Sequence, residues 1–336
     1  MIKTNTIRET VGMTVGMTVG MTVGMTVDLT VKVLLVAAIF FGAIFFSEDV
    51  NAHDGVHVDV DKINKQIEES DDPGPLYLLR AKLCRKHGRP DLGLLDLQQA
   101  RGMGVDPDAE ALERALCLRD RMKSTEALSI LDKLVDRRSK NLMEVLSERS
   151  NLRDAVGQIE GAINDLVRVH VVSPDLEKTL RLGDLYERRG ADALAVSVYR
   201  QAMESGMESS LLVIARIRAE TASGGYEVAL KLVNEKLQEA SLKATWYQRR
   251  AEIYRASGRE EKAIADLEKA LEELDGIFKR RPVPIHQVTR ARVLRLLGRL
   301  EEARQQLVEV LANAPGYASA QRELDLVDQL EKQKTP

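Results

Sequence analysis

The sequence is poor in aromatic residues, in cysteine and in net charge. Phe, Trp and Tyr make up 4% of the 336 residues, whereas Asp, Glu, Lys and Arg make up 30%. Long solvated helices have this composition, and a β-protein with an aromatic-rich core does not. The formal net charge is −3 at pH 7, so charge gives no reason to expect nucleic acid or an anionic membrane surface as a partner.

The sequence also lacks the residue spacings of common catalytic sites. Its five histidines form no H-E-x-x-H pair, no G-x-S-x-G occurs, and no glycine-rich phosphate loop follows an expected strand. Carboxylate pairs such as Glu260–Glu261 lie on expected helix faces, where a solvated charge is the ordinary state. We therefore predict a protein that is not an enzyme and that uses no cofactor.

What the sequence does contain is a motif that recurs seven times between residues 74 and 315. The copies align on a small residue: Gly93, Ala127, Ala162, Ala195, Ala229, Ala263 and Ala303. A large residue follows four positions later: Leu97, Leu131, Leu166, Tyr199, Val233, Leu267 and Leu307. Five positions before the small residue, Met122 stands in the second copy and glycine in the others: Gly88, Gly157, Gly190, Gly224, Gly258 and Gly298.

Each copy predicts two helices joined by a tight turn. Apolar residues at helical spacing precede a glycine that can end a helix in a left-handed conformation, and a second amphipathic run follows. The small residues allow the two helices of a pair to approach closely. One hairpin cannot bury its own apolar face, so neighbouring hairpins must stack, and about three are needed for stability.

The period and its pattern resemble the tetratricopeptide repeat, whose unit is a helix–turn–helix of 34 residues. The clearest copy contains Leu182-Gly183-x₂-Tyr186, followed by Gly190, Ala195, Tyr199 and Ala202. The resemblance implies an all-α, right-handed α-solenoid of about seven hairpins over residues 74–315. After Pro315, residues 316–336 are expected to form a C-terminal cap helix and tail.

The first 52 residues have the character of an export signal. After Lys32, residues 33–46 (VLLVAAIFFGAIFF) are fourteen apolar residues without a charge. This length fits the apolar region of a secretory signal and falls short of the roughly 20 residues of a membrane span. Small residues at Val50 and Ala52 suit a cleavage site within the segment 33–52, which would make His53 the mature N-terminus.

We therefore expect an exported, periplasmic or cell-envelope protein. One alternative is an uncleaved inner-membrane anchor that places the repeats outside the cytoplasm, which is the one membrane association expected. A buried helix is a further alternative. In residues 1–32, Val-Gly-Met-Thr occurs four times, and glycine at every fourth position disfavours regular structure. Met25 is a candidate true start, and residues 53–73 are expected to be a lead-in helix or linker.

Two small sets of residues have open interpretations. Cys84 and Cys117 occupy nearly the same place in the first and second repeats, so they are either buried core residues or, in an oxidising compartment, a disulfide. His53 and His57 would lie beside a new N-terminal amine, and these nitrogens suit copper or zinc. The alternative function is therefore a cell-envelope metal-handling accessory protein, and the plainer interpretation is a polar lead-in.

Arginine occupies the position where this repeat family usually has leucine in six copies: Arg80, Arg114, Arg149, Arg216, Arg250 and Arg290. In three copies an aspartate follows sixteen residues later: Asp96, Asp165 and Asp266. We predict bidentate Arg–Asp bridges between the two helices of a repeat. The alternative is a row of arginines that binds acidic partners.

The resemblance also implies where a protein or peptide partner would bind. Family ligands usually contact the first helix of each repeat, on the concave side, where this chain has Lys82, Arg85, Lys86, Asn151, Asp154, Asp184, Glu187, Arg218, Gln248, Glu252, Arg255, Arg292 and Arg295. This set is basic at both ends and acidic in the middle. The Lys/Asn clamp that some members use for C-terminal carboxylates is not matched as a set.

The predicted function is therefore a non-enzymatic exported scaffold with a protein or peptide in its groove, against the alternative of an unselected solvated surface. Arg292 and Arg295 lie three residues apart on one expected helix face. We expect their reversal to glutamate to weaken partner binding while leaving the fold intact.

Overall fold

The computed structural model describes residues 50–280 and 283–334, with side chains for 60–279 and 283–333. All regular structure in these ranges is helical, which confirms the predicted all-α class. No helix within them is long and apolar enough to cross a membrane. The Val-Gly-Met-Thr repeat and the apolar run at 33–46 lie outside the described residues. The expected cleavage site falls at the start of the first described helix, α2 (Val50–Glu69).

The chain divides into two compact units, residues 1–134 and 135–336. In the first unit, α2 is followed by α3 (Gly74–Lys86), α4 (Pro90–Ala100), α5 (Pro107–Asp120) and α6 (Ser124–Asp136), whose last two residues fall beyond the boundary. Helix α3 packs against α2, α4 and α5. Ala81, Leu97 and Cys117 form a buried cluster among them.

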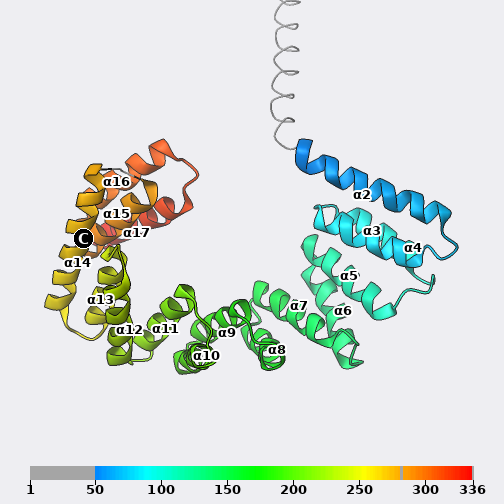
Figure 1. Ribbon diagram of the computed structural model, residues 1–336, viewed down its shortest axis with the longest axis horizontal. Coiled ribbons are helices and arrows are strands. Elements are labelled where there is room, and N and C mark those ends of the chain that lie inside the picture. The colour runs from blue at the N-terminus through cyan, green and yellow to red at the C-terminus, as the bar shows by residue number, and fades with distance from the viewer. Residues whose placement is uncertain (1–49, 281–282, 335–336) are drawn as a thin grey trace, which may run out of the picture. The chain divides into compact units, whose positions relative to one another are not determined.

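The second unit continues the same alternation of first and second helices (Figure 1). Its helices are α7 (Leu142–Ala155), α8 (Ile159–Val172), α9 (Leu176–Arg188), α10 (Asp192–Glu204), α11 (Ser210–Ala222), α12 (Tyr226–Glu239), α13 (Ala244–Ala256), α14 (Glu260–Arg280), α15 (Pro284–Leu296), α16 (Leu300–Asn313) and α17 (Ala318–Lys334). Each packs against the next helix in the chain. The predicted cap is α17, which packs against both α15 and α16.

The described helices from α3 to α16 thus form seven consecutive pairs. The long interval between Ala263 and Ala303 has a simple structural cause. Helix α14 has 21 residues, whereas the other second helices have 11 to 14. The extra turns extend the sixth pair without changing its register.

The turn between the helices of every pair contains one residue in the left-handed conformation, as predicted. In the first pair it is Gly88, with φ of 71°, and in the second it is Met122, with φ of 61°. The Met122 amide donates to the Arg119 carbonyl at 2.8 Å, and the Lys123 amide donates to the Leu118 carbonyl at 2.9 Å. These bonds close the end of α5 and hold Met122 in a conformation that usually selects glycine.

The small residues lie at the contact between paired helices, also as predicted. All six alanines of the repeat position are fully buried. In the first pair, a Cβ on Gly93 would lie 3.0 Å from the Cys117 Sγ and 3.1 Å from the Ala81 carbonyl oxygen. Glycine therefore replaces alanine where a neighbouring thiol already fills the space.

The two cysteines are core residues. Cys84 and Cys117 are both buried and form no disulfide, so the core interpretation is confirmed. Burial raises the pKa of Cys84 and raises that of Cys117 to about 12. Both side chains are therefore protonated at physiological pH and poorly nucleophilic, because the thiolate is the reactive form.

Candidate functional site

The predicted Arg–Asp bridges are present in all three pairs that carry both residues. Arg80 donates to Asp96 from Nε at 2.9 Å and from Nη2 at 2.6 Å. Arg149 binds Asp165 in the same way at 2.8 and 2.7 Å, and Arg250 binds Asp266 at 2.6 and 2.8 Å. The three aspartates are buried. The bridges are bidentate, so they fix the orientation of the two helices as well as their distance.

Several of these arginines also join their own pair to the preceding helix. Arg80 donates from Nη1 to Asn64 of α2 at 2.6 Å, and Arg250 donates from Nη1 to Asn234 of α12 at 2.6 Å. Arg290 also joins its pair to the preceding helix, with different partners: it binds Asp275 of α14 at 2.5 Å and Gln306 of α16 at 2.8 Å. These guanidinium groups are occupied inside the protein, which favours the structural interpretation over the ligand-binding one.

The two remaining arginines of this row pair within their own helix. Arg114 binds Glu110, and Arg216 lies 3.4 Å from Glu220. Sixteen residues after them the chain has Ile130 and Leu232 in place of aspartate. The second and fifth pairs therefore lack the Arg–Asp bridge.

All thirteen predicted binding residues lie on first helices, and we call the surface that they form the first-helix face; Gln248 is its one buried member. Several of them join consecutive pairs. Asp154 of α7 accepts from Arg188 of α9 at 2.6 Å, and Glu187 of α9 accepts from Arg218 of α11 at 2.5 and 2.9 Å. In the first unit, Arg85 of α3 binds Glu113 of α5. Opposite charges that the sequence alone left unassigned thus stabilise the stacking of the pairs.

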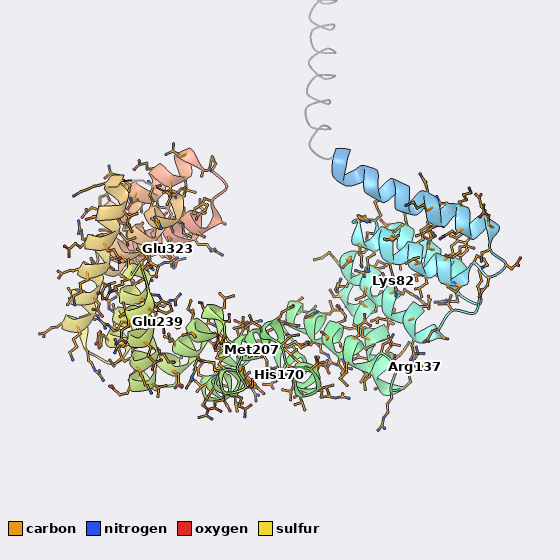
Figure 2. The ribbon with its side chains drawn as sticks, viewed as in Figure 1. Lys82, Arg137, His170, Met207, Glu239 and Glu323 are labelled. Carbon is orange, nitrogen blue, oxygen red and sulfur yellow. The ribbon has the colours of Figure 1, made fainter. Side chains whose placement is uncertain are left out.

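The other predicted residues have varied surroundings. Gln248 is buried and donates to Glu252 at 2.9 Å. Arg255 binds Glu260 at 2.7 Å and donates to the Leu296 carbonyl at 3.2 Å. The side chains of Lys82, Lys86 and Asp184 are exposed, and that of Asn151 is half-buried. Lys82 is labelled in Figure 2.

Arg292 and Arg295 require a correction. Both bind Glu323 of the cap helix α17, at 2.6 and 3.0 Å; Glu323 is labelled in Figure 2. Glu323 is only 5% exposed. Reversing both arginines would place two carboxylates against a buried carboxylate, so the expectation that this change leaves the fold intact is wrong.

Sequence reasoning missed Arg249, which lies on the same face of the second unit. The neighbouring repeats explain its environment. Arg181 is the sixth residue of α9 and donates at 3.3 Å to the hydroxyl of Ser150, the ninth residue of α7. Arg249 is the sixth residue of α13. In α11, Ile217 follows Arg216 as Ser150 follows Arg149 in α7. An isoleucine therefore stands where Arg249 would need an acceptor.

The charges around Arg249 add to the cost of this position. Burial lowers the pKa of Arg249, and the charges of Arg292 and Arg218 lower it further against an opposing effect of Glu252. Arg218, by contrast, has its pKa raised by its hydrogen bond to Glu187. The half-buried side chain of Arg249 makes no hydrogen bond or ion pair with any residue that the structure describes. No pattern in one sequence reveals this, because it depends on which residues of successive pairs meet.

The metal-binding alternative rests on His53 and His57, whose side chains lie outside the described residues. Among the side chains that the structure does describe, no group of three or more His, Cys, Asp or Glu residues could hold a metal ion.

Comparisons with known proteins agree with this architecture. The sequence model of the family described as tetratricopeptide repeat matches residues 244–273, which comprise α13 and most of α14. A crystal structure of a tetratricopeptide repeat protein from Parabacteroides merdae superposes with a TM-score of 0.50 at 20% identity, over 76% of this chain and 98% of that one. The C-terminal part of a repeat protein of this kind from Cytophaga hutchinsonii covers 83% of this chain and 98% of its own, with a TM-score of 0.45 and 15% identity.

No curated protein sequence matches the chain significantly. The sixth helix pair matches the sequence model of the tetratricopeptide repeat, and the chain shares its fold with a solved tetratricopeptide repeat protein.

Proposed function

We propose that this protein is a non-enzymatic scaffold that binds an acidic segment of a partner protein on the first-helix face of its second unit. The scaffold would consist of seven copies of the repeat, since every helix pair from α3 to α16 has a left-handed residue at the same turn position. The observation that carries the proposal is Arg249, a half-buried cation that has an isoleucine, Ile217, where a related pair has the acceptor Ser150.

An uncompensated cation in this position costs folding free energy. Arginine stays protonated at every physiological pH, so Arg249 cannot relieve the cost by losing its proton. Removing a charge from water without a partner is unfavourable. A carboxylate bound from outside would remove that cost, and the planar guanidinium group suits bidentate carboxylate binding.

The neighbouring arginines favour an acidic segment over a single anion. Arg218 uses Nε and Nη2 to hold Glu187, and Arg292 uses Nε to hold Glu323. Their other N–H groups have no described acceptor. Arg218, Arg249 and Arg292 lie on α11, α13 and α15, which are the first helices of three consecutive helix pairs. A peptide lying across these helices would present carboxylates to more than one of them.

The test is peptide binding to wild type and to Arg249→Gln. The probe is a fluorescein-labelled twelve-residue peptide of alternating Glu and Gly, compared with its Gln/Gly counterpart by fluorescence anisotropy. Loss of one partner of a desolvated charge pair costs about 2–5 kcal/mol of binding free energy, so we expect Arg249→Gln to weaken binding of the acidic peptide tenfold or more.

The matched control is Arg168→Gln, which removes an exposed charge from the second helix α8. This variant should keep wild-type affinity, and the Gln/Gly peptide should bind neither protein. Equal affinity of wild type and Arg249→Gln for the acidic peptide would refute the assignment.

We also propose that the protein is exported, either cleaved or held by an N-terminal anchor. Support comes from the uncharged apolar run at 33–46 and from the small residues Val50 and Ala52. Mass spectrometry of the protein isolated from its own cells should find His53 as the first residue of a cleaved form, or an intact apolar run in a membrane fraction. An intact N-terminus in a soluble cytoplasmic fraction would contradict export. A start other than His53 would also remove the amine of the metal-handling alternative.

A further inference from the structure

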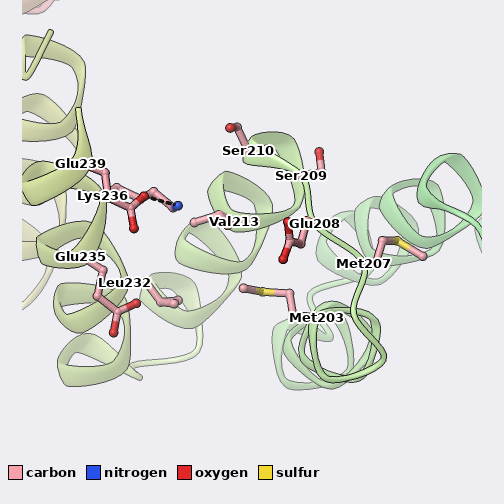
Figure 3. Close-up of a pocket in the computed structure, with 10 residues that line it drawn as sticks. All are labelled: Met203, Met207, Glu208, Ser209, Ser210, Val213, Leu232, Glu235, Lys236 and Glu239. Carbon is pink, nitrogen blue, oxygen red and sulfur yellow. Dashed lines mark hydrogen bonds and ion pairs between the residues drawn. The ribbon is translucent and has the colours of Figure 1, made fainter. Parts of the chain in front are cut away.

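An open groove in the second unit lies between the fourth and fifth helix pairs, and none of its residues belongs to the first-helix face described above. Its volume is about 760 Å³, and it is lined by α10, α11, α12 and the connection between α10 and α11. In Figure 3, Met203 and Leu232 extend into this space from α10 and α12. We call it the methionine groove.

The groove occurs where an Arg–Asp bridge is missing. Leu232 follows Arg216 by sixteen residues, the position that Asp96, Asp165 and Asp266 occupy in other pairs. A leucine accepts no hydrogen bond, so Arg216 pairs with Glu220 of its own helix and lies 3.7 Å from the Met203 sulfur. The fifth pair thus has no ion pair at this position to hold α11 against α12, and Leu232 and Met203 remain half-buried.

The lining combines an apolar floor with an acidic rim. The floor consists of Met203, Met207, Val213 and Leu232. Methionine side chains are flexible and polarizable, and they adapt to apolar groups of different shape. The rim carries the three exposed carboxylates Glu208, Glu235 and Glu239, whereas Lys236, which binds Glu239 at 2.7 Å, supplies the one positive charge.

This combination defines the chemistry of an occupant. An apolar side chain would displace water from the floor, and a neighbouring cation would meet the two carboxylates that Lys236 leaves uncompensated. We propose that the methionine groove binds a partner segment in which a phenylalanine or leucine is flanked by lysine or arginine. The site proposed around Arg249 would take acidic groups, so the two sites differ in the charge that they select.

Methyl NMR can observe this groove directly. The full-length protein is labelled at the methionine ¹³C-methyl groups, and the signals of Met203 and Met207 are assigned with single leucine variants. The probe is the peptide acetyl-Lys-Ala-Phe-Lys-Ala-Lys-amide. The charge control is the same peptide with each lysine replaced by glutamate. We expect the Lys peptide to shift the Met203 and Met207 signals in a saturable manner and the Glu peptide to leave them unchanged.

The decisive variant is Leu232→Asp, which places an aspartate sixteen residues after Arg216. By analogy with Asp165, it should bind Arg216, close α12 onto α11 and abolish the peptide-induced shifts without lowering the thermal midpoint. Val228→Asp adds the same charge at an exposed position of α12 and should retain the shifts.

A second variant leaves the apolar floor unchanged. Glu208→Gln with Glu235→Gln should weaken the Lys peptide fivefold or more. Peptide-induced shifts that persist in Leu232→Asp, or equal shifts with the Glu peptide, would overturn the proposal. Concentration-dependent shifts without peptide would overturn it as well, because they would show a second copy of this chain in the groove.

Discussion

Replacing Asp165 by asparagine is expected to destabilise the second unit by about 3–5 kcal/mol, the usual cost of removing one partner from a buried ion pair. Asp165 accepts hydrogen bonds from Arg149 Nε and Nη2 at 2.8 and 2.7 Å, and from Arg153 Nη1 at 2.9 Å. Its side chain is 3% exposed, and that of Arg149 is 10% exposed. Asparagine keeps the shape of aspartate but turns an amide N–H group toward a guanidinium group.

Urea unfolding followed by circular dichroism measures this loss, and hydrogen exchange of α7 and α8 locates it. The control is Asp184→Asn, whose exposed carboxylate lies 3.7 Å from Arg188 and should contribute no more than about 1 kcal/mol. A loss from Asp165→Asn as small as that of the control would contradict the structural role of the bridge.

The fourth pair suggests a rescue for the same position. It has Leu182 and Val198 where the third pair has Arg149 and Asp165. The double change Arg149→Leu with Asp165→Val should therefore be less destabilising than Asp165→Asn alone, because it leaves no buried charge without a partner. Arg153, at 20% side-chain exposure, can turn to solvent in this variant.

The second large effect is expected at Gly183. Alanine normally favours a helix interior by about 1 kcal/mol over glycine. At this position, however, a Cβ would lie 2.1 to 2.2 Å from atoms of the Tyr199 ring, which is fully buried. Overpacking of this kind costs about 1–3 kcal/mol or more, so Gly183→Ala should lower the thermal midpoint despite its higher helix propensity.

The rest of the chain shows how to reverse this loss. Four other first helices have alanine at the position of Gly183, namely Ala81, Ala115, Ala251 and Ala291. Their pairs have leucine at the position of Tyr199. Adding Tyr199→Leu to Gly183→Ala should therefore recover most of the loss in a double-mutant cycle measured by thermal unfolding. Additive losses from the two changes would show that the glycine and the tyrosine are not matched to each other.

Replacing Tyr199 also affects the first-helix face. The Tyr199 hydroxyl donates at 2.8 Å to Glu187, which in turn holds Arg218. Tyrosine thus replaces leucine in the pair whose Glu187 holds Arg218. The double variant should regain stability and still bind the acidic peptide more weakly, because Glu187 loses a donor.

The sequence predicts contacts inside a pair better than contacts between pairs. The left-handed turn residues follow from a spacing of five residues before the small residue of the repeat, and the Arg–Asp bridges from a spacing of sixteen residues. Both contacts lie within one helical hairpin, whose geometry is the same in every pair. Contacts such as Glu187–Arg218 and Arg292–Glu323 cross from one pair to the next. Their partners depend on the length of each connection and on the stacking of the pairs, so one sequence does not reveal them.

The same reason explains why the arginines of the first-helix face were difficult to rank from the sequence. Arg292 and Arg295 share the charge and helix position of a ligand-binding arginine, but the cap helix supplies Glu323 to both. Arg249 is not distinguished by any motif. It stands out only when its register with Ile217 is compared with that of Arg181 with Ser150.

The central claim is that Arg249 is a cation left without an internal partner and held for an external carboxylate. Thermal unfolding of full-length wild type and Arg249→Gln, each with and without the Glu/Gly peptide, tests it most directly. A ligand that binds only the folded state raises its stability. We predict that Arg249→Gln melts higher than wild type without peptide, and that the peptide raises the midpoint of wild type more than that of Arg249→Gln. A lower midpoint for Arg249→Gln, together with equal peptide-induced shifts in both proteins, would contradict the claim.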